Sequence, residues 1–242
     1  MLRNPPQVTV VALPGTGSDA AFAARAFGPA AAAHGLAFQA VEPDPQAVIA
    51  SCTAALSSAA ARGPVLVAGI SLGAAIALDW AAEQPTAVVG VITALPAWTG
   101  AETAACPAAL SASVTARQLR ADGLEAVLER MRTSSPPWLA DALTQSWRGQ
   151  WPYLPQALDE AAAYAWPTAD QLAATTVPVA VVGATDDPVH PIAVAEEWAA
   201  TLPTAALHRL TLAELGADPA VIGHAGFAEL RGLLPDSATI DA

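Results

Sequence analysis

The stretch VLVAGISLGAAIAL, residues 65–78, decides the fold. It opens with the apolar run of a buried strand, and an alanine-rich helical segment begins near Leu72. Between them, Gly69-Ile70-Ser71-Leu72-Gly73 matches the pattern G-x-S-x-G. A sharp turn from strand to helix needs small flanking residues, which Gly69 and Gly73 supply, and it leaves Ser71 at a helix N-terminus that favours negative charge. This context favours a reactive serine over the alternative, an ordinary N-cap serine in a glycine-rich turn.

The same alternation of short apolar runs and longer alanine-rich stretches continues on both sides of this segment. Strands that are apolar on both faces and separated by helices form parallel sheets that helices cover. We therefore predict an α/β fold with a doubly wound, mostly parallel sheet of about six strands. Strands are expected at residues 8–13, 37–42, 65–68, 87–92, 177–182 and 206–212, and helices at 19–34, 47–62, 72–83, 192–202 and 225–234.

Residues 97–170 interrupt this rhythm, because they contain no convincing strand and hold five of the seven tryptophans. We predict a core made of residues 1–96 and 171–242 and a helical cap insertion made of residues 97–170. Long segments that leave a sheet at this point typically form lids. The tryptophans would either line a substrate pocket or form the lid's own small core. Trp98, which lies nearest the sheet, is the pocket candidate.

Polar residues that could serve Ser71 follow the last two predicted strands. A serine hydroxyl needs a base, and the base needs a group that orients it. The pair Asp186-Asp187 follows the strand at residues 177–182, at the end of the sheet where ligands bind in open parallel sheets. His224 precedes the expected final helix. His190 lies in the same loop as Asp187, and we interpret it as a solvent-facing turn residue more readily than as a site residue.

The chain order of serine, acid and histidine resembles the α/β-hydrolase superfamily, in particular its capped serine hydrolases and esterases. The resemblance covers Val8 to Leu234 and implies a catalytic triad of Ser71, Asp187 and His224. The family's segment Asp-Pro-x-x-Pro selects Asp187 when counted back from its prolines, whereas counting forward from the preceding glycine selects Asp186. The family's usual first two strands have no room here, since only seven residues precede Val8.

The resemblance also assigns roles to the loop Pro14-Gly15-Thr16-Gly17. The backbone N–H groups of Thr16 and Leu72 would form an oxyanion hole. Gly15, together with Trp98, would line the substrate pocket. The family commonly has a histidine where this chain has Pro14, but the backbone supplies the hydrogen bond.

We therefore expect an enzyme that hydrolyses an ester of a small or medium apolar acyl group through an acyl-enzyme. A thioesterase, a C–C hydrolase or a lyase with the same triad are alternatives, as is a non-enzymatic binding module. No metal or cofactor is expected, because metal-ligand motifs are absent and a chain without lysine has no P-loop lysine.

Charge and hydropathy narrow the class of partner. A net charge of −12 disfavours nucleic-acid binding. No apolar run is long enough to span a membrane. The expectation is a soluble, cytoplasmic protein that acts on a small molecule, with a homodimer left open.

Overall fold

The computed structural model describes residues 7–234 and contains one six-stranded sheet in which every pair of neighbouring strands is parallel. The strand order is β2-β1-β3-β4-β5-β6. This architecture confirms the predicted fold class. The strands are β1 (Thr9–Leu13), β2 (Ala37–Ala40), β3 (Val65–Ile70), β4 (Val88–Ala94), β5 (Val179–Ala184) and β6 (Ala205–Leu210).

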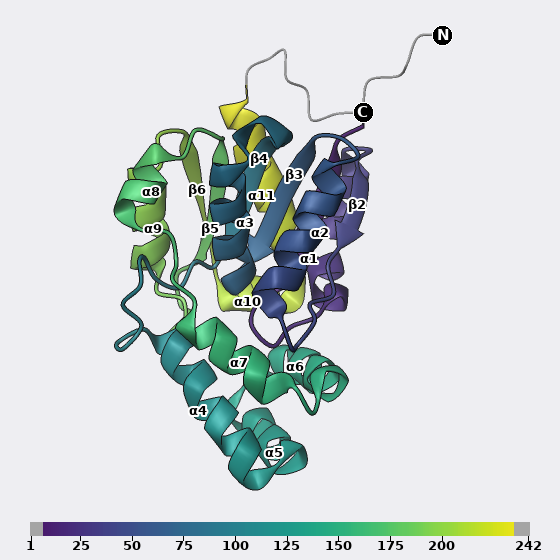
Figure 1. Ribbon diagram of the computed structural model, residues 1–242, viewed down its shortest axis with the longest axis vertical. Helices are drawn as coiled ribbons and strands as arrows, with labels where there is room; N and C mark the ends of the chain where they lie inside the picture. The colour runs from purple at the N-terminus through teal and green to yellow at the C-terminus, as the bar shows by residue number, and fades with distance from the viewer. Residues whose placement is uncertain (1–6, 235–242) are drawn as a thin grey trace.

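Helices cover both faces of the sheet (Figure 1). Helices α1 (Ala20–Ala33) and α11 (Ala220–Leu233) pack on one face, and α2 (Val48–Ala60), α3 (Leu72–Glu83) and α9 (Ile192–Thr201) pack on the other. Successive strand side chains point to opposite faces. In β1, Val10 and Ala12 therefore join one core, and Val11 and Leu13 join the other.

Five helices lie between β4 and β5. Four of them form a separate group beyond one end of the sheet, with a hydrophobic cluster of their own that includes Leu119, Leu128 and Leu158 (Figure 1). We call this group the helical insertion; it consists of α4 (Pro107–Asp122), α5 (Leu124–Ser134), α6 (Pro137–Gln150) and α7 (Leu154–Ala163).

The fifth helix, α8 (Ala169–Ala174), packs against α9. The predicted boundary at residue 170 thus falls inside α8. The outermost parts of the predicted core, residues 1–6 and 235–242, lie outside the described residues. Within the described range, none of the helices has the length and apolar character needed to cross a membrane.

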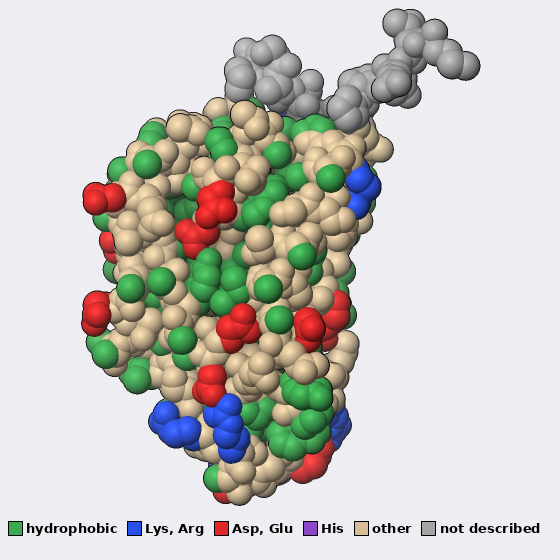
Figure 2. All heavy atoms as spheres, viewed as in Figure 1, with side chains coloured by type: hydrophobic (Ala, Val, Ile, Leu, Met, Phe, Trp, Pro, Cys, Tyr) green, Lys and Arg blue, Asp and Glu red, His purple; other side chains and the backbone are tan. Residues whose placement is uncertain are grey.

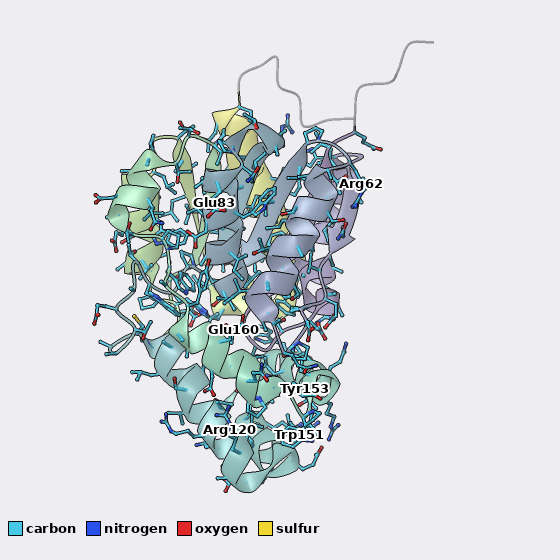
Figure 3. All side chains as sticks on the ribbon, viewed as in Figure 1. Arg62, Glu83, Arg120, Trp151, Tyr153 and Glu160 are labelled. Atoms are coloured by element: carbon cyan, nitrogen blue, oxygen red, sulfur yellow. The ribbon has the colours of Figure 1, made fainter. Side chains whose placement is uncertain are left out.

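Hydrogen bonds tie α7 to the start of α2. The carboxylate of Glu160 accepts the N–H groups of Val48 at 2.9 Å and Ile49 at 3.2 Å, and Figure 3 shows Glu160 between the two helices. Nε2 of Gln156 donates to the carbonyl of Gln46 at 2.9 Å. A carboxylate at a helix N-terminus satisfies N–H groups that have no partner within the helix. The helical insertion is therefore anchored to the core.

Arginines concentrate on the helical insertion, whereas acidic side chains are spread over the visible face (Figure 2). These arginines pair mainly between helices rather than along one helix. Arg148 of α6 contacts Glu125 of α5 at 2.8 Å, and Arg120 of α4 pairs with Asp159 of α7. Such exposed pairs contribute little to stability, so the apolar cluster holds the insertion together.

The segment after β6 differs from the prediction. It contains a short helix that was not expected, α10 (Leu212–Ala217), and α11 begins at Ala220 rather than near residue 225. Pro219 is the N-cap of α11, and Oδ1 of Asp218 accepts the N–H of Ala220 at 2.9 Å. Asp-Pro is a helix-start signal, and it places His224 inside the helix.

Candidate active site

Ser71 lies at a strained turn between β3 and α3. Its φ of 52° is in the left-handed region, which residues other than glycine rarely adopt. A Cβ at Gly69 would lie 2.1 Å from the carbonyl oxygen of Gly73, and one at Gly73 would lie 2.5 Å from that of Pro14. The backbone therefore passes too closely for any side chain at either position. The N–H of Ser71 donates to the carbonyl of Ala94 at 2.8 Å, which holds the turn against β4.

His190 joins Ser71 to Asp187 by two hydrogen bonds. Its Nε2 lies 3.0 Å from Oγ of Ser71, and its Nδ1 lies 2.8 Å from Oδ2 of Asp187. Oδ1 of Asp187 also accepts the N–H groups of Val189 at 2.8 Å and His190 at 3.2 Å. This turn follows β5 and places the acid and the imidazole on one short loop.

The charge of Asp187 fixes the roles of the two imidazole nitrogens. Burial disfavours the carboxylate, but the hydrogen bonds and charge of His190, with the two backbone N–H groups, hold the pKa of Asp187 below its usual value. An ionised Asp187 only accepts hydrogen bonds, so Nδ1 carries the proton. Nε2 is then free to accept the proton of Ser71.

The structure corrects the prediction for the histidine. His224 is exposed on α11, whose buried side faces the sheet and α1 through residues such as Ile222 and Phe227. The prediction was wrong because α11 begins five residues earlier than expected, so His224 does not lie in the loop after β6. The spacing Asp187-x-x-His190 was the signal available in the sequence, since an aspartate that accepts backbone N–H groups closes a turn over the next residues.

The two neighbouring aspartates have different partners. Oδ1 of Asp186 accepts the N–H of Leu212 at 2.7 Å, which connects the loop after β5 to the first residue of α10. Asp187 is the one that contacts the histidine. Of the two ways of counting the family motif, the one anchored on the downstream prolines therefore selects the residue found at the site.

A cavity of about 640 Å³ lies over Ser71 and extends into the helical insertion. Gly15, Thr16, Ser71, Asp187 and His190 line the end at the sheet. The opposite wall consists mainly of apolar side chains from the insertion, among them Val127, Met131, Trp138, Leu139, Leu143, Trp147 and Leu158.

Trp98 does not line this cavity. Its ring packs against Trp166, with centroids 4.2 Å apart, and Trp166 in turn contacts Trp198 at 5.9 Å. Trp98 therefore belongs to the core beneath the helices on one face of the sheet. The pocket prediction for Trp98 is corrected, and Trp138 and Trp147 are the tryptophans at the cavity. Proximity to the sheet misled the prediction because the chain turns back onto the core before it enters α4.

Both residues predicted to form an oxyanion hole belong to the surroundings of Ser71: Leu72 follows it in the chain, and Thr16 lines the same cavity. Leu72 is the first residue of α3, where helical N–H groups have no partner within the helix. Thr16 lines the cavity on the loop between β1 and α1, and a Cβ at the adjacent Gly15 would lie 3.5 Å from Cβ of Ser71. Leu95, with φ of 53°, also lines the cavity, and no sequence feature singles it out.

Comparisons with known proteins agree with this fold. The sequence profile of the family described as serine aminopeptidase, S33, matches residues 37–215. BpoC from Mycobacterium tuberculosis H37Rv, described as a non-heme bromoperoxidase, has a similar structure, with a TM-score of 0.70, 19% identity and coverage of 96% of this chain and 95% of that chain.

Two further solved structures are similar. A thermophilic esterase from Thermogutta terrifontis has a TM-score of 0.69 and 15% identity over 95% of this chain and 92% of that chain. An enol-lactonase from Burkholderia xenovorans LB400 has a TM-score of 0.62 and 16% identity over 86% and 84%. A search of curated protein sequences finds no match. The profile match, which spans most of the chain, shows that the protein belongs to the serine aminopeptidase S33 family and is an α/β-hydrolase enzyme.

Proposed function

We propose that this enzyme hydrolyses esters of small or medium apolar acyl groups, with Ser71 as nucleophile, His190 as general base and Asp187 as the residue that orients His190. The hydrogen-bonded chain from Ser71 through His190 to Asp187, with distances of 3.0 and 2.8 Å, carries the proposal. A serine hydroxyl is a weak nucleophile unless such a base takes its proton. His190 replaces His224 in the triad expected from the sequence.

The reaction begins when Oγ of Ser71 attacks the ester carbonyl carbon and its proton passes to Nε2 of His190. The carbonyl electron pair moves to oxygen, and the N–H groups of Thr16 and Leu72 stabilise that oxyanion. When the intermediate collapses, the bond to the alcohol breaks and His190 gives the alcohol its proton. Water, deprotonated by His190, then attacks the carbonyl carbon of the acyl-enzyme. The bond to Oγ of Ser71 breaks, His190 returns its proton to Oγ, and the acid is released. Ionised Asp187 stabilises the imidazolium in both halves.

The cavity wall supports an apolar acyl group. Its charged lining residues, among those described, are Asp187 and Arg130. Asp187 already accepts a hydrogen bond from His190, and Arg130 pairs with Asp122 at 2.6 Å. A peptide N-terminus would need a carboxylate to balance its ammonium group, because an unpaired buried charge is costly. The lining therefore favours an uncharged ester over the peptide that the family's description suggests.

The test is turnover of p-nitrophenyl esters of graded acyl length, together with matched thioesters. We expect hydrolysis of the esters with a maximum at small or medium length. Ser71→Ala should lower kcat by several orders of magnitude, about 10⁴ to 10⁶. An alkyl phosphonate should modify wild type at Ser71, as located by peptide mass spectrometry. Absence of turnover with all esters and no adduct at Ser71 would contradict the proposal.

A further inference from the structure

Two buried side chains of α6 bind the loop that carries Thr16. Oγ of Ser146 donates to the carbonyl of Gly17 at 2.7 Å, and Nε2 of Gln150 donates to the carbonyl of Ser18 at 2.8 Å. The two side chains are 4% and 5% exposed. Ser146 also lies 3.3 Å from the carbonyl of Leu143, so its single proton favours the shorter contact with Gly17. Buried polar groups are seldom left without such partners.

Trp147, between these two residues, fits the shape of the same loop. A Cβ at Gly17 would lie 2.9 Å from Nε1 of Trp147, so the indole packs directly on the backbone of Gly17. Gly17 also has φ of 67°, which a side chain would strain. Both observations show that this position requires glycine. They also show that the loop packs closely against α6.

The loop connects Ser146 to Thr16 through two peptide groups. The N–H of Ser18 donates to the carbonyl of Gly15 at 3.0 Å, which closes a turn. The carbonyl of Gly17 and the N–H of Ser18 belong to one planar peptide group, and the carbonyl of Gly15 and the N–H of Thr16 belong to another. In a trans peptide the N–H points away from the C=O. The hydroxyl of Ser146 therefore stands at one end of a chain of hydrogen bonds, and the N–H of Thr16 is at the other.

We propose that α6 holds the oxyanion hole in place, with Ser146 as the main positioning residue and Gln150 as its support. The inference rests on the proposed function, in which the N–H of Thr16 stabilises the oxyanion. The bond from Ser146 fixes the peptide group between Gly17 and Ser18, and the turn then fixes the direction of the Thr16 N–H. Each hydrogen bond in such a chain also polarises the next. The helical insertion thus completes the catalytic centre as well as covering it.

The test compares Ser146→Ala, Ser146→Thr and Gln150→Leu with wild type. Thr144→Val is the matched control, because Thr144 is also a buried hydroxyl of α6 but bonds Ala140 and Arg132 rather than the loop. For each variant we would measure kcat and KM for a p-nitrophenyl ester and the melting temperature. We would also measure the inhibition constant of an alkyl trifluoromethyl ketone, which adds to Ser71 and places an oxyanion in the hole.

We expect Ser146→Ala to lower kcat about tenfold, a fraction of the 10²–10³ lost when an oxyanion donor is removed outright. KM should stay near wild type, and the inhibition constant should rise in parallel with the loss in kcat. Ser146→Thr should recover most of the loss, Gln150→Leu should show a smaller loss, and Thr144→Val should lower only the melting temperature.

A variant Ser146→Ala that melts earlier but keeps wild-type kcat and inhibition would overturn the inference. The inference would also be overturned if Thr144→Val and Ser146→Ala lowered the melting temperature equally and lowered kcat equally. If the wild-type protein neither hydrolyses the esters nor is modified by the phosphonate at Ser71, the proposed function is wrong. This outcome is measured on the wild-type protein, so it is distinct from a failure of the inference about Ser146.

Discussion

The loop after β5 and helix α11 after β6 each carry a histidine, but only the histidine of the loop contacts Ser71. In the loop, Asp187 accepts two backbone N–H groups, and the resulting turn directs His190 at Ser71. In α11, the helical period turns His224 to solvent while its neighbours pack on the sheet. The place of a histidine in the order of strands and helices therefore does not decide whether it can serve Ser71. The local backbone decides it, because it sets the direction of the imidazole.

The largest effect should separate these two histidines. His190→Ala removes the group that accepts the proton of Ser71, so we expect kcat to fall by about 10⁴ to 10⁶. His224→Ala should leave kcat close to wild type. Steady-state kinetics with a p-nitrophenyl ester checks both, and circular dichroism verifies folding. A deep loss in the His224 variant with near-normal activity in the His190 variant would restore the triad expected from the sequence.

A somewhat smaller effect should separate Asp187 from Asp186. Asp187→Asn keeps an oxygen for the N–H groups of Val189 and His190 but loses the carboxylate oxygen that accepts Nδ1–H. We therefore expect kcat to fall by about 10⁴. Asp186→Asn keeps its hydrogen bond to Leu212 and should be nearly as active as wild type. Equal losses in both variants would mean that the two carboxylates share the role.

The pH dependence of kcat/KM tests which group titrates. In the proposed mechanism the base must be unprotonated to accept the proton of Ser71, so we expect kcat/KM to fall as the pH is lowered. The pKa of Asp187 is lowered in the folded protein, so its carboxylate is still ionised at the usual pKa of an aspartate. Loss of this charge therefore affects the activity only at a pH below that usual pKa. A kcat/KM that does not fall as the pH is lowered would contradict the role of His190.

The smallest effect should separate two tryptophans. Trp138 lines the cavity, so Trp138→Ala should shift kcat/KM toward longer or bulkier acyl groups by about 1–3 kcal/mol. Trp98 packs in the core, so Trp98→Ala should lower stability by about 3–5 kcal/mol and leave the acyl profile unchanged. Trp98→Phe provides a milder variant if Trp98→Ala does not fold. If the dependence of kcat/KM on acyl length changed in both variants or in neither, Trp138 and Trp98 would not differ in their effect on specificity, which would contradict this prediction.

The sequence predicted the core well because each strand is short, apolar and bounded by turn residues. The turn at Ser71 was predictable because close backbone approach admits only glycine at its flanks. The start of α11 was missed because the Asp218-Pro219 signal lies among residues that read as a loop. Bonds such as those from Ser146 to Gly17 join segments more than a hundred positions apart, and nothing in local composition marks such a pair.

The two-residue spacing between Asp187 and His190 has a consequence for tolerance to change. Groups that sit on different elements lose their alignment when a domain shifts or a distant core residue is replaced. Here one tight turn sets the distance between carboxylate and imidazole, so the pair moves as a unit and keeps its spacing. Helix α11 contributes no group to this pair, and His224 lies on its exposed side, so we expect substitutions at His224 to be tolerated. A graft of residues 184–191 would carry both groups into another parallel sheet as one cassette.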